Sequence, residues 1–69
     1  MQNQNDQIAR MNQAVDECLG RCSQASTPPA LTIEGYCREL HDERGWDNAE
    51  GQRVREIATL TLVQRAVGP

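Results

Sequence analysis

Three cysteines and one histidine are the side chains of this chain best suited to chemistry. Cys18 and Cys22 stand four residues apart, and Cys37 and His41 repeat that spacing after a gap of fourteen residues. On helices, each pair would share one face. An antiparallel hairpin of two such helices would then bring four nitrogen and sulfur ligands together, as tetrahedral zinc requires. A zinc-stabilised helical hairpin adaptor is therefore one hypothesis.

The competing interpretation is that Cys18 and Cys22 act as small apolar side chains in a helix interface, with His41 on the solvent side. A helical C-x3-C pair is much less diagnostic of zinc than a C-x2-C knuckle. We expect the packing role, with no bound metal and no cofactor.

Catalysis has little support in the sequence. His41, Asp42 and Glu43 are consecutive, and neighbouring residues on a helix point in different directions. The chain has no Gly-rich loop and no nucleophile elbow. We expect a solvated charged turn here, no catalytic residues, and a protein that is not an enzyme.

The first segment that must position these residues is a helix over about 6–25. Its apolar positions recur at steps of three and four, which is the a/d pattern of a helix that packs against another helix. Glu17 and Arg21 stand four apart with the acid first, the favourable orientation for a helical ion pair. The predicted core or dimer seam consists of Ile8, Met11, Val15, Cys18 and Cys22.

Local signals predict two further helices. Thr27 as N-cap before Pro28 predicts a helix over about 28–44, which Gly45 would end. Asp47-Asn48-Ala49-Glu50 resembles a capping box and predicts a helix over about 47–67. The stretch 59–63 alternates in a β-like pattern, but the cap before it and the lack of a partner strand favour helix. A broad apolar face follows on this helix: Val54, Ile57, Ala58, Leu60, Val63 and Val67.

The length of 69 residues predicts a single all-α domain over 1–69, a small helical hairpin or three-helix unit. A chain this short buries only about 60% of its unfolded surface, so its stability is marginal. The apolar seam of the first helix and the broad face of the third exceed what such a monomer would cover. We therefore expect a homodimer that forms a helical bundle.

Net charge excludes some classes of partner. Ten acids oppose seven bases, all of them arginine, so the chain lacks the basic patch of a nucleic-acid-binding protein. A helix-turn-helix regulator stays a weighed alternative because Arg44-Gly45-Trp46 forms a suitable turn. The helix after that turn, however, begins with acidic residues. No apolar run is long enough to span a membrane, and the N-terminus lacks a signal-peptide pattern, so we expect a cytoplasmic location.

Partner binding is the remaining function class. Aromatic and arginine side chains dominate binding hot spots, and both aromatics lie near the end of the second helix. We predict Tyr36, Arg38, Arg44 and Trp46 as partner-binding residues, although Trp46 is equally suited to a core position.

The small, acidic, lysine-free chain with its MQNQNDQIARMNQ opening resembles the phage-encoded anti-quorum-sensing protein of Mu-like Pseudomonas phages. It is more loosely similar to the phage twitching-inhibitory protein. The resemblance implies a helical homodimer in the host bacterial cytoplasm that binds the LuxR-type activator LasR and blocks its binding to DNA. It also implies binding to the type IV pilus assembly ATPase PilB. These named partners are expectations from the resemblance alone.

Overall fold

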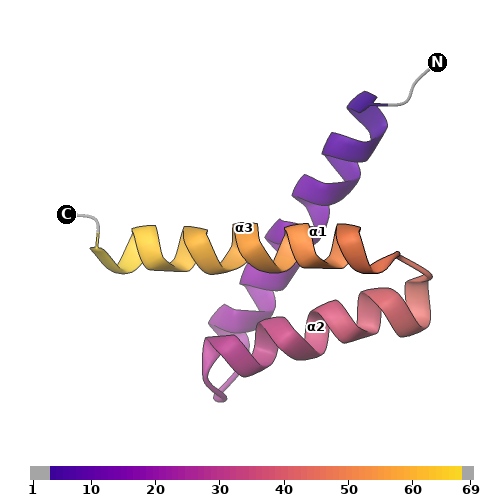
Figure 1. Ribbon diagram of the computed structural model, residues 1–69. Helices are drawn as coiled ribbons and strands as arrows, with labels where there is room; N and C mark the ends of the chain where they lie inside the picture. The colour runs from indigo at the N-terminus through magenta and orange to yellow at the C-terminus, as the bar shows by residue number, and fades with distance from the viewer. Residues whose placement is uncertain (1–3, 68–69) are drawn as a thin grey trace.

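The computed structural model describes residues 4–67, and side-chain positions for residues 6–67. Three α-helices make up this part of the chain, so the expected all-α three-helix unit is confirmed. They are α1 (Gln4–Gln24), α2 (Pro29–Arg44) and α3 (Asn48–Val67), each within two residues of the range that the sequence indicates. Helices α2 and α3 run side by side in opposite directions, and α1 crosses behind both (Figure 1).

The core lies where the three helices meet. At its centre, Tyr36, Leu40 and Val54 are fully buried, together with Cys18 of α1. Because α1 must contact both other helices, its buried face is wider than a two-position seam. The buried apolar side chains are Ala14, Val15, Cys18, Leu19, Ile33, Tyr36, Leu40, Trp46, Val54 and Ala58.

The residues of the predicted α1 seam lie at different depths. Val15 and Cys18 are in the core, and Met11 and Cys22 are half-buried against it. Ile8 is exposed, because the first turns of α1 extend past α2 and α3 (Figure 1). The seam therefore serves the monomer core from Met11 onward, and only its N-terminal end remains uncovered.

Local chemistry fixes the two connections. The prediction that Thr27 is the N-cap of α2 is wrong, because Pro28 occupies that position. The Thr27 hydroxyl instead shares a 2.9 Å hydrogen bond with the Thr32 hydroxyl. Gly45 ends α2 with a φ of 72°, and the Trp46 N–H donates to the Leu40 carbonyl at 3.0 Å. This left-handed turn reverses the chain and buries Trp46 beneath it.

Asp47 caps the start of α3, which confirms one half of the predicted capping box, whereas the Glu50 carboxylate lies 3.5 Å from Arg10 Nη1. The Glu50 N–H donates to Oδ1 of Asp47 at 2.9 Å, which satisfies one of the free donors of the first turn. The β-like stretch 59–63 is helical. There the Thr61 hydroxyl donates to the Ile57 carbonyl at 2.7 Å, an i−4 bond that a helix accommodates. Within residues 4–67, no helix is long and apolar enough to cross a membrane.

Candidate functional site

The polar residues between α1 and α2 form one cluster around Glu17. The Tyr36 hydroxyl donates to Glu17 Oε1 at 2.6 Å. Arg44 donates to both oxygens of the same carboxylate, at 3.1 and 3.2 Å, which is the bidentate geometry favoured by guanidinium. Arg21 forms a second fork with Glu39 at 2.7 and 3.0 Å. We call Glu17, Arg21, Tyr36, Glu39 and Arg44 the Glu17 cluster.

Both arginines of the cluster also cover the ring of Tyr36. The Arg21 guanidinium carbon lies 4.8 Å from the ring centroid and that of Arg44 lies 5.8 Å away. The predicted Glu17–Arg21 pair is present at 4.0 Å, but Arg21 contacts Glu39 more closely. Two cations and two carboxylates therefore neutralise one another within the fold.

These contacts shift the ionisation of the cluster. Hydrogen bonds from Arg44 and then from Tyr36 lower the pKa of Glu17 to about 2. The hydrogen bond from Arg21 lowers the pKa of Glu39. Burial raises the pKa of the Tyr36 phenol well above its usual value, and the hydrogen bond to Glu17 adds to that effect. At neutral pH, Tyr36 is therefore a neutral donor to an ionised Glu17.

Trp46 lies in a related arrangement on the other side of Glu17. The Arg10 guanidinium carbon stacks 4.1 Å from the centroid of the indole, and Arg10 Nη1 lies 3.5 Å from Oε2 of Glu50. Arginine stacking of this kind holds an aromatic ring against the core while keeping the charge in water. The surface above Trp46 is a shallow pocket of about 220 Å³.

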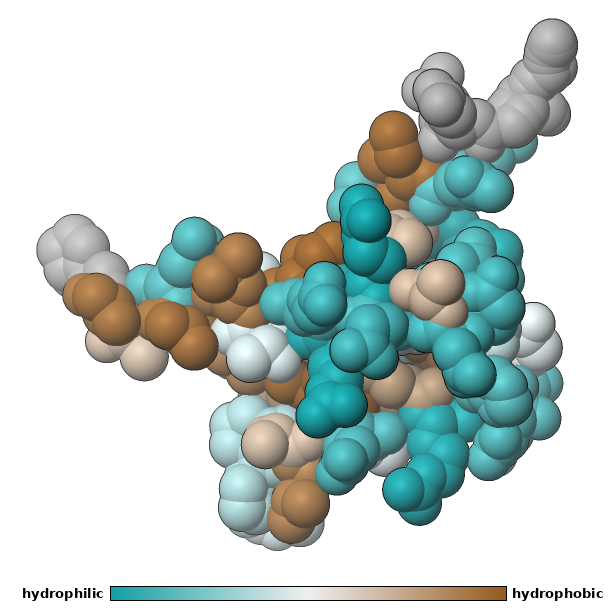
Figure 2. Space-filling view, in the orientation of Figure 1, coloured by the Kyte–Doolittle hydropathy of each residue, from teal (hydrophilic) through white to brown (hydrophobic). Residues whose placement is uncertain are grey.

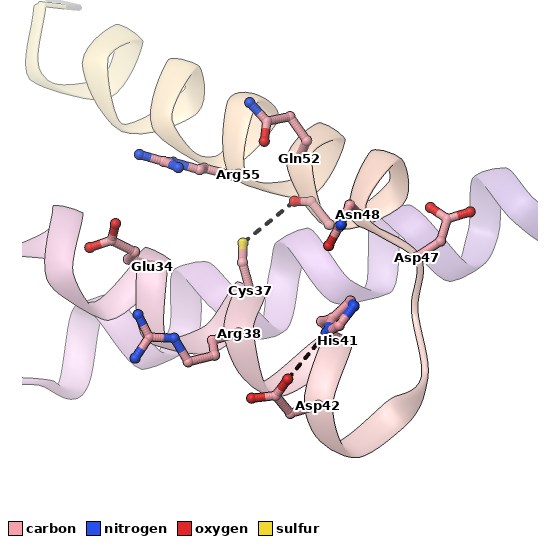
Figure 3. A pocket seen from close by; sticks show the side chains of 10 residues that line it. Glu34, Cys37, Arg38, His41, Asp42, Asp47, Asn48, Gln52 and Arg55 are labelled. Carbon is pink, nitrogen blue, oxygen red and sulfur yellow. Dashed lines mark hydrogen bonds and ion pairs between the residues drawn. The ribbon is translucent and has the colours of Figure 1, made fainter.

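The four predicted partner-binding residues do not form one surface. Tyr36 and Trp46 are only 1% and 6% exposed, and so belong to the core. Arg44 is engaged in the Glu17 cluster. Arg38 lies on the opposite side of α2, in a polar pocket of about 280 Å³ between α2 and α3 (Figure 3). The sequence could not show which of these residues are buried and which are exposed, because their depth depends on how α1 and α3 pack against α2.

The cysteines lie at different depths, and His41 lies on the exposed side. Cys18 is buried in the core, and burial raises the pKa of its thiol to about 12. Cys37 points toward the polar pocket, where its Sγ lies 3.5 Å from the Gly51 carbonyl oxygen (Figure 3). His41 Nδ1 lies 3.1 Å from Asp42 Oδ1 on the exposed side. Among residues 6–67 there is no group of three or more His, Cys, Asp or Glu side chains placed to hold a metal ion.

Several large apolar side chains of α3 are exposed. Val54 and Ala58 face the core, but Leu60, Val63 and Val67 are 57%, 52% and 79% exposed. The last turns of α3 extend beyond the start of α2, and Figure 2 shows hydrophobic atoms along that extension. We call the exposed residues Ile57, Leu60, Val63 and Val67 the α3 apolar face.

A groove lies beside this face. It has a volume of about 660 Å³ and runs between the start of α2 and the middle of α3. Leu60 and Val63 belong to both the face and the groove, so an apolar ligand could contact the two together. The groove is lined by Ala30, Ile33, Gln52, Arg55, Glu56, Thr59, Leu60 and Val63, and we call it the α2–α3 groove.

The sequence indicated a broad apolar face on the third helix but not which part stays exposed. Val54 and Ala58 are four apart on the core side. Leu60, Val63 and Val67 follow one another on the opposite side of the helix, at steps of three and four. The helical pattern predicts both sets, and only the position of α2 decides which set is covered.

The fold and this surface define the chain as a small all-α protein with an exposed apolar helix face and an adjoining groove. No protein-family model, curated protein or solved structure matches it.

Proposed function

We propose that the chain is a protein-binding module that inhibits its partner by occupying a surface, without turnover. The observation that carries this proposal is the α3 apolar face, which remains exposed beside the α2–α3 groove after the chain has folded. Contiguous exposed apolar surface on a small protein is typical of an interaction site. It replaces the predicted site at Tyr36 and Trp46, whose side chains are buried.

The mode of binding follows from the shape of the surface. A groove of about 660 Å³ that is open along a helix fits the apolar side of a partner helix. Covering a Leu or Val side chain completely is worth about 1.5–3 kcal/mol, and less when it is already half covered. Leu60, Val63 and Val67 would therefore supply most of the binding energy, as a few central side chains do in most interfaces.

Self-association is part of this proposal. Ile8, at the uncovered end of α1, is an exposed apolar side chain against which a second copy could pack without covering the α3 apolar face. We propose a homodimer, in keeping with the short chain and its small core. Light scattering at several micromolar concentrations should give twice the chain mass, and a monomer mass throughout would contradict the proposal.

The resemblance to the anti-quorum-sensing protein supplies the proposed targets. On that basis we propose that the chain acts in a bacterial cytoplasm, binds the LuxR-type activator LasR and releases it from DNA. The pilus assembly ATPase PilB is a second proposed target. The resemblance alone supports both names, whereas the protein-binding class is also supported by the α3 apolar face.

A gel-shift titration tests the proposed function. The purified chain should release the activator from its promoter DNA, with an end point at a fixed molar ratio and no contact with the DNA itself. Leu60→Gln combined with Val63→Gln should abolish release while circular dichroism stays helical, because both side chains are exposed. Leu31→Gln, an equally exposed change on α2, is the matched control and should release normally.

Two results would contradict this scheme. Full release by the Leu60→Gln, Val63→Gln variant would show that the contact surface lies elsewhere. Direct binding of the chain to duplex DNA at physiological salt would favour the helix-turn-helix alternative. That alternative has Asp47 and Glu50 at the start of the reading helix, where phosphate would be repelled.

A further inference from the structure

The seven arginines divide into two groups according to their partners. Arg10, Arg21 and Arg44, on α1 and at the end of α2, each pair with a carboxylate. Within residues 6–67, no ion pair involves the remaining four, which lie on α2 and α3: Arg38, Arg53, Arg55 and Arg65. These four guanidinium groups keep their full capacity to bind an external carboxylate.

Charge is also segregated along the chain. Residues 51–69 carry three arginines and one glutamate, a net charge of +2, whereas residues 1–50 carry four arginines and nine acids, a net charge of −5. The α3 apolar face is therefore set in the one positive segment of an acidic protein. Charged residues that flank an apolar surface favour a partner of opposite charge and disfavour one of the same charge.

Arg53 and Arg55 lie beside the apolar surface. Arg53 and Leu60 are seven residues, two helical turns, apart and therefore share one side of α3. Arg55 lines the α2–α3 groove and also the neighbouring polar pocket, which contains Arg38 (Figure 3). Gln52 lines both as well, so the groove and the pocket adjoin along α3. The same lining contains carboxylates, which an incoming ligand must approach: Glu34, Asp42, Asp47 and Glu56.

We propose that the α3 apolar face and the α2–α3 groove bind an acidic amphipathic helix of another protein. Its apolar stripe would cover Leu60 and Val63, and Asp or Glu residues flanking the stripe would meet Arg53 and Arg55. This inference rests on the proposed protein-binding function and adds the charge of the partner. A second copy fits less well, because α3 packed on α3 would bring two segments of net charge +2 together.

Two designed peptides test the inference against the full chain. Each is an amphipathic helix of about 20 residues, long enough to be helical in water. They have the same Leu stripe, flanked by Glu in the acidic probe and by Lys in the basic probe. Fluorescence anisotropy should show the acidic probe binding at least about tenfold more tightly at low salt. The difference should shrink in ~1 M salt, where the Debye length is about 3 Å.

Variants of the chain distinguish the apolar contact from the contact between charges. Leu60→Gln should weaken both probes about tenfold or more. Arg53→Gln with Arg55→Gln should weaken only the acidic probe, which removes the preference between the two. Arg10→Gln removes one cation from a paired position on α1 and is the matched control, for which both affinities should stay unchanged.

The contrary outcomes are distinct. Equal affinity for the two probes would overturn the inference while leaving the proposed protein-binding function in place. If neither probe binds and Leu60→Gln converts a dimer to a monomer in light scattering, the occupant is a second copy and the inference is overturned. If neither probe binds and the chain is a monomer, the proposed function fails with it. Tighter binding to phosphatidylserine vesicles than to the acidic probe, lost in Leu60→Gln, would assign the surface to a membrane instead.

Discussion

The Tyr36 hydroxyl donates a 2.6 Å hydrogen bond to Oε1 of Glu17 and thereby joins the centre of α2 to α1. The bond is short because its acceptor is an ionised carboxylate. The ring of Tyr36 is buried, whereas the Glu17 side chain is partly in water and is also held by Arg44. Tyr36 thus contributes both to the apolar core and to the polar contact between the helices.

Replacing Tyr36 by Phe keeps the ring and removes this hydrogen bond. We expect Tyr36→Phe to lower the free energy of unfolding by about 1–2 kcal/mol, whereas Tyr36→Ala also leaves a cavity and should cost about 3–5 kcal/mol. Urea unfolding measures both. In a Glu17→Gln background the Tyr36→Phe cost should be smaller, and an equal cost in the two backgrounds would show that the pair is not coupled.

The lowered pKa of Glu17 makes stability depend on acid. Folding lowers this pKa from 4.5 to about 2, so the folded chain binds the proton more weakly than the unfolded chain does. The contribution of Glu17 is complete above pH 4.5 and is lost as the pH falls toward 2. Water screens this partly exposed side chain, so the effect is modest. Urea midpoints between pH 6 and pH 2.5 should fall less in Glu17→Gln than in the parent chain.

Replacing two of the glycines by alanine should change the stability of the chain in opposite directions. A Cβ at Gly20, within α1, would meet nothing within 4 Å, so Gly20→Ala should stabilise the chain by about 0.5–1 kcal/mol. Gly45 has a φ of 72°, which an alanine adopts only with strain, so Gly45→Ala should destabilise it by about 1–2 kcal/mol. Thermal melts of both variants check the pair. A stable Gly45→Ala variant would mean that the turn before Trp46 adopts another conformation.

The thiols should differ in reactivity. Cys18 is fully buried, and burial raises the pKa of its thiol to about 12, so little thiolate is available at pH 8. We expect iodoacetamide to modify the half-exposed Cys22 well before Cys18 in the folded chain. In denaturant all three cysteines should react. Mass spectrometry of the alkylated peptides gives the order, and equal rates at Cys18 and Cys22 in the folded chain would contradict the buried position of Cys18.

Measuring the zinc content of the purified chain distinguishes two hypotheses: cysteines that only pack in the core, and cysteines that hold zinc in a helical adaptor. We expect less than stoichiometric zinc by elemental analysis after purification without chelators. Cys22→Ser should then cost only about 1–3 kcal/mol. A structural zinc site would give about one zinc per chain, and its loss would unfold the protein.

The sequence by itself determined the three helices, the end of α2 and the start of α3. Asp47 caps α3 and Gly45 ends α2 through contacts with residues a few positions away, so their effect is visible in a short window of sequence. The apolar spacing likewise predicted that Val15 and Cys18 would lie on a packed face of α1. Local sterics and backbone hydrogen bonding decide these features, and they require no knowledge of the other helices.

Only the tertiary structure decided which charges and apolar residues meet. Arg21 binds Glu39, eighteen residues away, more closely than its helical neighbour Glu17. Nothing in the local sequence marks Glu39 as that partner. The crossing of α1 behind α2 and α3 covers Tyr36 and Trp46, which looked suited to binding. Leu60 stays uncovered because α3 packs through its opposite side, where Val54 and Ala58 are buried. Burial depends on the relative placement of whole helices, because each helix can cover only the part of its neighbour that lies against it.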